Sequence, residues 1–106
     1  MADFLLLYTG GGAPETEEEQ AKVMQAWTDW YGKIGASLKD GGNPFTGVAK
    51  TVGSDGSVKD GAPGALHTGY TIVQADSFDA ATAIAKGSPV LSSGGSVTVY
   101  ETFEVM

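Results

Sequence analysis

Side chains able to exchange a proton near neutral pH are scarce in this chain. His67 is the only histidine, and histidine is the side chain that ordinarily titrates in that range. It follows Asp60 by seven residues within a glycine-rich stretch, so the two would form a general acid and base if both reached one cavity. A lone histidine in a loop is more often only solvated, and both interpretations stay open at this point.

Glu101 is the third candidate, because it interrupts an apolar alternation. It falls on the same strand face as Val97, Val99 and Phe103. A carboxylate in such surroundings must be paired, protonated or turned toward a wet pocket. The sequence therefore predicts either an ion pair or register feature at a subunit interface, or a contact with a ligand.

The sequence predicts neither a metal nor a cofactor. There are no cysteines, and a single histidine would leave a metal with carboxylates alone. Gly10-Gly11-Gly12 lies between a strand and a helix, but Glu15 occupies the place of the third glycine in the dinucleotide-binding pattern. We therefore interpret the glycines as a flexible connector. No serine lies in a nucleophile-elbow motif.

The composition indicates a single domain, residues 1–106, with an acidic surface. The net charge of −7 comes from 13 acidic residues and 6 lysines, without any arginine. Clustered Lys and Arg bind nucleic acids and anionic membranes, so we expect neither as a partner. Phe4–Tyr8 is too short for the apolar region of a signal peptide and no basic residue precedes it, which predicts a cytoplasmic protein.

The first element that must position these groups is a strand at Phe4–Tyr8. Five large apolar residues in a row make both faces of this strand apolar, so both faces must be covered by protein. An amphipathic helix can cover one face. We expect a second copy of the chain to cover the other, which makes the protein a homodimer.

A long helix is predicted to follow this strand. Thr16-Glu17-Glu18-Glu19 has the form of a capping box with acids in the first turn, and glycines followed by Pro44 end the helix at 39–44. Gly32 and Gly35 are expected to let the helix lie close to the sheet. The helix carries an apolar stripe whose positions step by three and four: Val23, Met24, Trp27, Trp30, Tyr31, Ile34 and Leu38. We expect both tryptophans in the core, with Trp27 anchoring the helix and an indole edge reaching a polar group or a cavity.

The remaining chain alternates strands, turns and one further helix. The predicted elements are a strand at Val48–Val52, a type I′ turn at 54–57, a return strand at 57–59, a loop at 60–68, a strand at 69–75, a helix at 78–86 and a strand at 96–105. Right-handed connections then give a ferredoxin-like βαββαβ domain of the α+β class, with an antiparallel sheet, both helices on one face and an extra small hairpin.

The order of motifs resembles the YCII-related family over nearly the whole chain. The resemblance implies a dimeric α+β barrel, and most of that family has no assigned reaction. The motifs that carry the resemblance are Phe4–Tyr8, Trp27-x-x-Trp30, Gly41-Gly42-Asn43-Pro44-Phe45, Thr51–Gly56, Asp60-Gly61, Gly69-Tyr70 and Gly94–Glu101. One branch of the family has Asp-Gly-Pro-Phe where this chain reads Asp60-Gly61-Ala62-Pro63.

This chain departs from the family at one chemical feature. Some relatives carry a histidine on the first helix and an aspartate beyond it, proposed as a catalytic pair. Residues 16–38 contain no histidine here, although Asp40 could stand for the aspartate. The resemblance therefore does not carry the pair over to this chain.

Two functions follow as hypotheses. The first is a dimeric module without catalysis that binds a small organic ligand in a cleft between the first helix, the sheet and the 60–69 loop. The ligand contacts expected for it are Trp27, Trp30, Tyr70 and Glu101. The alternative is a small lyase or isomerase that needs no cofactor and uses His67, Asp60 or Glu101 as acid or base.

Overall fold

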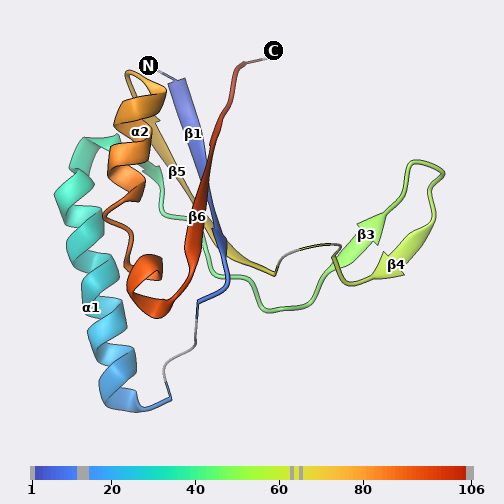
Figure 1. Cartoon of the computed structure of the whole chain (residues 1–106), viewed down its shortest axis with the longest axis horizontal. Coiled ribbons are helices and arrows are strands. Elements are labelled where there is room, and N and C mark those ends of the chain that lie inside the picture. Colours follow the sequence, from blue (N-terminus) through green and yellow to red (C-terminus); the bar gives the residue numbers. More distant parts are fainter. Residues whose placement is uncertain (1, 12–14, 63, 65, 105–106) are drawn as a thin grey trace.

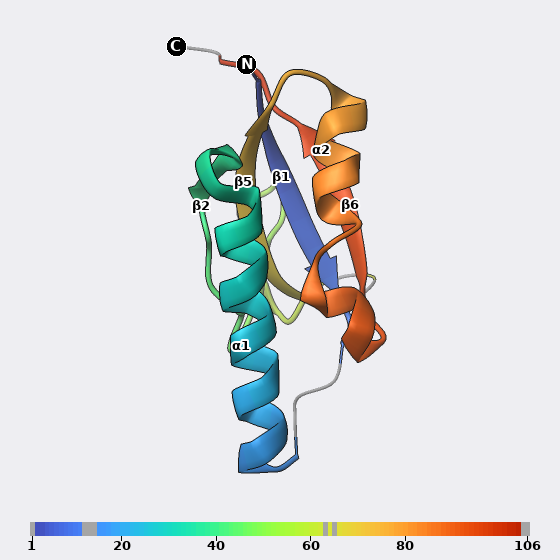
Figure 2. The same cartoon turned by 90° about the vertical axis from the view of Figure 1, so that its left-hand side faces the viewer.

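The fold is an antiparallel sheet with two helices on one of its faces (Figures 1 and 2). It is seen in a computed structural model that describes residues 2–11, 15–62, 64 and 66–104. The predicted connector at Gly10-Gly11-Gly12 is therefore described only at its first two glycines, and Pro63 lies outside the described residues.

The element order confirms the predicted fold class. The sheet has the strand order β2-β5-β1-β6 with every pair antiparallel, and β3 and β4 form a separate hairpin. This is the ferredoxin-like βαββαβ arrangement with one added hairpin. The elements are β1 (Ala2–Thr9), α1 (Glu17–Ile34), η1 (Gly35–Ser37), β2 (Leu38–Asp40), β3 (Lys50–Val52), β4 (Val58–Asp60), β5 (His67–Ala75), α2 (Phe78–Ala85), η2 (Pro89–Ser93) and β6 (Ser96–Glu101). No helix in the described part of the chain has the length and apolar character that crossing a membrane requires.

β1 is the central strand around which the two layers are built. It pairs with β5 along one edge and with β6 along the other. Phe4, Leu6 and Tyr8 are buried on the face covered by the helices. Leu5 and Leu7, which alternate with them, point to the opposite face, over which neither helix lies (Figure 1). The helices therefore cover one apolar face of β1, whereas they leave its other apolar face uncovered.

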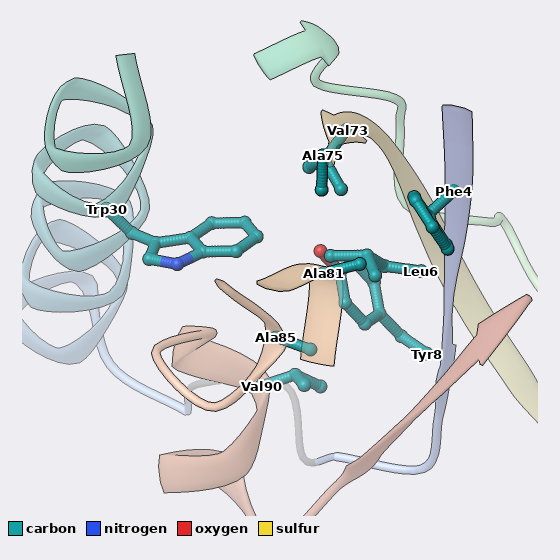
Figure 3. Packing of buried hydrophobic residues seen from close by; sticks show 9 residues of the cluster. All are labelled: Phe4, Leu6, Tyr8, Trp30, Val73, Ala75, Ala81, Ala85 and Val90. Atoms are coloured by element: carbon teal, nitrogen blue, oxygen red, sulfur yellow. The ribbon is translucent and has the colours of Figure 1, made fainter. Parts of the chain in front are cut away.

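The core joins both helices to the sheet (Figure 3). Trp30 is only 5% exposed, and its indole Nε1 donates a hydrogen bond of 3.3 Å to the carbonyl of Ile84 on α2. Trp27 is half-buried at the edge of the core, where its ring meets Tyr8 edge-on at 5.4 Å between centroids. The prediction of core tryptophans is therefore confirmed for Trp30, while Trp27 lies at a boundary. The core consists of Phe4, Leu6, Tyr8, Trp30, Val73, Ala75, Ala81, Ala85 and Val90.

The start of α1 is capped as predicted. The hydroxyl of Thr16 accepts a hydrogen bond of 3.1 Å from the N–H of Glu19, and the Glu19 carboxylate accepts one of 3.2 Å from the N–H of Glu15. The acids of the first turn face the positive end of the helix dipole. Capping at this site depends on local sequence alone, which is why it could be predicted.

The predicted end of α1 is wrong. Gly35 has a positive φ of 52° and its N–H bonds back to the carbonyl of Tyr31, so the helix ends at Ile34. Leu38, which continues the spacing of the apolar stripe, instead begins β2 and pairs with Val73. Gly32 does not provide close packing on the sheet either, because a Cβ there would meet nothing within 4 Å.

The predicted hairpin exists, but its turn type is wrong. Gly56 N–H bonds to Gly53 O at 2.9 Å, and only Gly56 in this turn has a positive φ. This is a type I turn followed by a left-handed glycine rather than a type I′ turn. The Asp55 carboxylate accepts a hydrogen bond of 2.9 Å from the N–H of Ser57, which lowers the pKa of Asp55 and stabilises the turn.

The last strand is shorter than predicted. β6 ends at Glu101, which pairs with Phe4, and Thr102 N–H still bonds to Asp3 O at 3.0 Å. In this register Phe103 would stand opposite Ala2, the first residue of β1, so β1 offers no described partner to Glu104. Residue 105, the end of the predicted strand, lies outside the described residues.

Replacing Trp30 with alanine is expected to lower the free energy of unfolding by about 3–5 kcal/mol. The change removes a buried ring and one of the two donors to the Ile84 carbonyl, which still accepts from Gly87 N–H at 3.1 Å. The measurement is equilibrium unfolding in urea. Trp27→Ala serves as the comparison and should cost less, because Trp27 is half-buried. A loss below about 1 kcal/mol for Trp30→Ala, well under the range for buried aromatic side chains, would contradict this packing.

Candidate ligand-binding site

A cavity of about 670 Å³ opens between α1 and the end of the sheet. One side is the apolar face of α1, and the other is formed by the ends of β1 and β5. The segment 41–45, which we call the rim, closes part of its edge. Its lining comprises Tyr8, Gly10, Gly11, Val23, Met24, Trp27, Thr28, Tyr31, Gly41, Gly42, Asn43, Pro44, Phe45, Thr68, Gly69, Tyr70, Val90 and Ser93.

The rim is held against β5 by backbone contacts that require glycine. Gly42 has a φ of +69°, and a Cβ at this position would lie 1.9 Å from the carbonyl oxygen of Tyr70. No other residue can occupy such a position without moving the backbone. Pro44 forms an isolated bridge with Gly69, and the Phe45 N–H bonds to Thr68 O at 2.8 Å. The rim therefore has a defined backbone position.

Aromatic rings dominate the inner wall. The Trp27 ring lies 5.4 Å from that of Tyr8 and 5.8 Å from that of Tyr31. At the mouth of the cavity, the rings of Phe45 and Tyr70 are 6.1 Å apart. Such rings bury large apolar area and contact flat ligands by stacking or by their edges. The wall therefore suits a flat, largely apolar molecule.

Two phenols are held in place at the inner end of the site. The Tyr8 hydroxyl donates to Thr71 Oγ1 at 2.6 Å, and Tyr31 donates to the carbonyl of Gly41 at 3.1 Å. Thr71 Oγ1 also donates to the Gly41 carbonyl, again at 3.1 Å. Burial raises the pKa of Tyr8 and that of Tyr31 above their ordinary value, so both phenols stay protonated at neutral pH. The network joins α1 and β1 to the first residue of the rim.

The described lining carries no histidine, lysine, aspartate or glutamate. Its polar side chains are neutral hydroxyl and amide groups, which can donate and accept hydrogen bonds but do not titrate near pH 7. Within the described parts of the chain, no three His, Cys, Asp or Glu residues lie together as a metal site would require. The neutral polar side chains other than the tyrosines are Thr28, Asn43, Thr68 and Ser93.

Of the four ligand contacts predicted from the sequence, two lie on the cavity. Trp27 and Tyr70 line it. Trp30 lies in the core and is absent from the lining. Glu101 pairs with Phe4, which places it on the helix side of the sheet as the alternation predicts, but its side chain is exposed and away from the cavity. The expectation that Glu101 lies among buried apolar residues is wrong, because the core ends before this position.

The candidate acid–base pair is not assembled. The Nδ1 atom of His67 lies 3.1 Å from Thr9 Oγ1, whereas the Asp60 carboxylate is 3.7 Å from the ammonium of Lys50 on the hairpin. Both side chains are exposed and neither lines the cavity. Asp40 has a different role, since its carboxylate accepts a hydrogen bond of 2.8 Å from Gly42 N–H and shapes the start of the rim.

Sequence reasoning missed the rim and the two hydrogen-bonded phenols. The glycines and Pro44 at 39–44 predict the end of a helix, although two adjacent glycines before Asn-Pro also indicate a close approach of backbones. The sequence pattern places Tyr8 and Tyr31 on apolar faces, and no signal in it shows that their hydroxyls meet near Gly41.

The comparisons with known proteins establish the fold. The sequence matches no protein-family model, and no curated protein matches it. Among solved structures, the chain is similar to 5-chloro-2-hydroxyhydroquinone dehydrochlorinase from Burkholderia phenoliruptrix AC1100, in complex with 2,5-dihydroxybenzoquinone. The TM-score is 0.52 at 16% identity, covering 95% of this chain and 93% of that chain. A likeness at this identity shows a shared α+β fold.

Gly42→Ala is expected to lower the free energy of unfolding more than Gly94→Ala, by about 1–3 kcal/mol, the usual cost of overpacking. Both glycines have a positive φ, but a Cβ at Gly94 meets nothing within 4 Å. The difference therefore isolates the contact with Tyr70 from the conformational strain. Urea unfolding of the two variants measures it, and equal losses would show that the rim does not need the close approach.

Proposed function

We propose that this chain is a YCII-related domain that forms a homodimer and binds a small, flat organic molecule in the cavity. The observation that carries the proposal is the described lining, which is aromatic and contains no group that titrates near neutral pH. A volume of about 670 Å³ lies within the range of ~300–1,000 Å³ typical of small-molecule sites.

The chemistry of the lining favours an uncharged or weakly charged ring with hydroxyl or carbonyl substituents. Trp27 and Tyr31 offer aromatic surface to the ring, and the amide of Asn43 offers both a donor and an acceptor. The lack of cationic side chains on the described lining disfavours phosphates and carboxylates. The structural neighbour's complex with 2,5-dihydroxybenzoquinone, a flat ring with hydroxyl and carbonyl substituents, supports the shape and the substituents of this ligand class, but not its charge, because the acidic hydroxyls of that quinone are ionised at neutral pH.

The alternative is a small lyase or isomerase that works without a cofactor. The neighbour's name, a dehydrochlorinase, favours it. Its proposed acid–base groups, His67, Asp60 and Glu101, lie off the described lining, which weighs against it. We therefore place ligand binding first.

The ligand hypothesis is tested with 2,5-dihydroxybenzoquinone by isothermal titration calorimetry. Trp27→Ala is expected to weaken binding about tenfold, because one good aromatic contact is worth up to ~1.5 kcal/mol. Phe103→Ala, at a position that is 83% exposed and off the lining, should leave the affinity unchanged. Equal affinity for the two variants would show that the ligand does not bind in this cavity. Chloride release from 5-chloro-2-hydroxyhydroquinone would favour the enzyme instead.

The open face of the sheet supports the homodimer. It presents Leu5 and Leu7 of β1 beside Ile72 and Tyr100, which stand opposite Leu5 on β5 and β6. Asp3, which shares this face with Leu5 and Leu7, is ion-paired with Lys39. The hydrogen bond from the Lys39 ammonium lowers the pKa of the Asp3 carboxyl. An apolar sheet face without a cover is a docking surface, and a twofold axis would bring the same face of a second copy onto it. Such a pair of sheets would form a dimeric α+β barrel.

Sedimentation equilibrium at low micromolar concentration is expected to give twice the chain mass of 10.9 kDa. Leu5→Asp should shift the protein toward the monomer, because it places a charge in the centre of the open face. Ala83→Asp, with the same charge change on an exposed position of α2, is the matched control. A wild-type protein that is a stable, soluble monomer at this concentration would refute the paired sheets.

A further inference from the structure

The hairpin formed by β3 and β4 stands apart from the body of the protein. We call residues 46–62 the arm, and it extends from the side of the sheet opposite the helices (Figures 1 and 2). The radius of gyration is 15.2 Å, compared with about 13 Å for a compact chain of this length. An isolated two-stranded hairpin is marginally stable in water. We therefore expect the projecting arm to be stabilised by packing against another surface.

One face of the arm is apolar at its centre. Val52 and Val58 are directly opposite each other and are 67% and 58% exposed. The neighbouring pair on that face is Lys50 with Asp60, which are joined by an ion pair. Adjacent valines flanked by a neutralised charge pair form a surface suited to contact with protein rather than with water.

We propose that the arm grips a second copy of this chain through Val52 and Val58, and that this contact holds the mouth of the ligand cavity in its binding-competent form. The inference rests on the homodimer and the cavity of the proposed function and assigns a role to the arm in both. The partner copy thereby completes the site.

The direction and charge of the arm single out a second copy as the occupant. Two sheets packed face to face lie about 10 Å apart, and the arm projects on the side where the open face lies (Figure 1). A copy packed on that face therefore lies within its reach. The arm holds two lysines, Lys50 and Lys59, and two acids, Asp55 and Asp60. The net charge of −7 thus resides outside the arm, which can approach an acidic copy without net repulsion.

The segments that flank the arm on both sides are hydrogen-bonded at the cavity mouth. At its start, Phe45 N–H bonds to Thr68 O at 2.8 Å. Beyond its end, Leu66 O accepts from Gly10 N–H at 2.9 Å, and Thr68 Oγ1 donates to Gly10 O at 2.9 Å. A contact that orders the arm therefore orders both sides of the mouth.

Tyr70 links the mouth to the open face. It lines the cavity and stands opposite Leu7, which belongs to the open face. Its ring lies 6.1 Å from that of Phe45, the rim residue that leads into the arm. The dimer face and the cavity thus share a residue, which gives a direct route from subunit contact to ligand affinity.

The test compares V52D/V58D with K59D. Each variant makes the net charge of the chain more negative by two units, but Lys59 points to the other face of the hairpin, opposite Thr51. In sedimentation equilibrium, V52D/V58D is expected to raise the dimer dissociation constant by about tenfold or more. Hydrogen exchange at the amides of Phe45 and Gly10 should accelerate, and the affinity for 2,5-dihydroxybenzoquinone should fall. K59D should leave all three unchanged.

A second variant controls for the possibility that two aspartates unfold the hairpin itself. V52T/V58T keeps the shape and strand preference of valine and should move the same three quantities in the same direction by a smaller factor. The proposal is overturned if V52D/V58D dimerises as the wild type does, or if it dissociates while exchange at Phe45 and Gly10 stays unchanged. A wild type that fails to bind the quinone, with exchange still responding to the arm, would refute the proposed ligand and leave the arm contact standing.

Discussion

The structure depends on β1 being hydrogen-bonded along both of its edges. Pairing with β5 and pairing with β6 each fix the register of β1. A slip of one residue would exchange the two faces of the strand. Leu6 then lies in the core and Leu5 on the open face. Every later feature follows from that alternation, because the helices pack only where the strand presents its buried side.

The cavity is a consequence of where this packing stops. Trp30 holds α1 against α2 through the Ile84 carbonyl, while Trp27, three residues earlier, is half-buried at the edge of the core. Tyr8 occupies the last buried position of β1 and is hydrogen-bonded to Thr71, so the sheet ends in a polar group rather than in another layer of apolar side chains. The space between the helix and the strand ends remains open as the cavity.

Local signals predicted the elements well, and long-range geometry accounts for the rest. The cap at Thr16 and the alternation of β1 depend on neighbouring residues and could be predicted. The end of α1 could not, because Leu38 continues the helical spacing although Gly35 has already turned the chain. The rim also escaped prediction, since the need for glycine at position 42 arises from the carbonyl of Tyr70, a residue distant in sequence.

The rigid backbone of the rim has a consequence for how such a site can diversify. Since the Gly42 contact fixes the backbone of one edge, the shape of the cavity can vary at the helix that faces it. Val23, Met24 and Thr28 line the cavity from α1, which is anchored independently through Trp30. Exchanges at these three positions can reshape the wall without disturbing the core, so the shape of the cavity and the stability of the fold can evolve, or be engineered, separately.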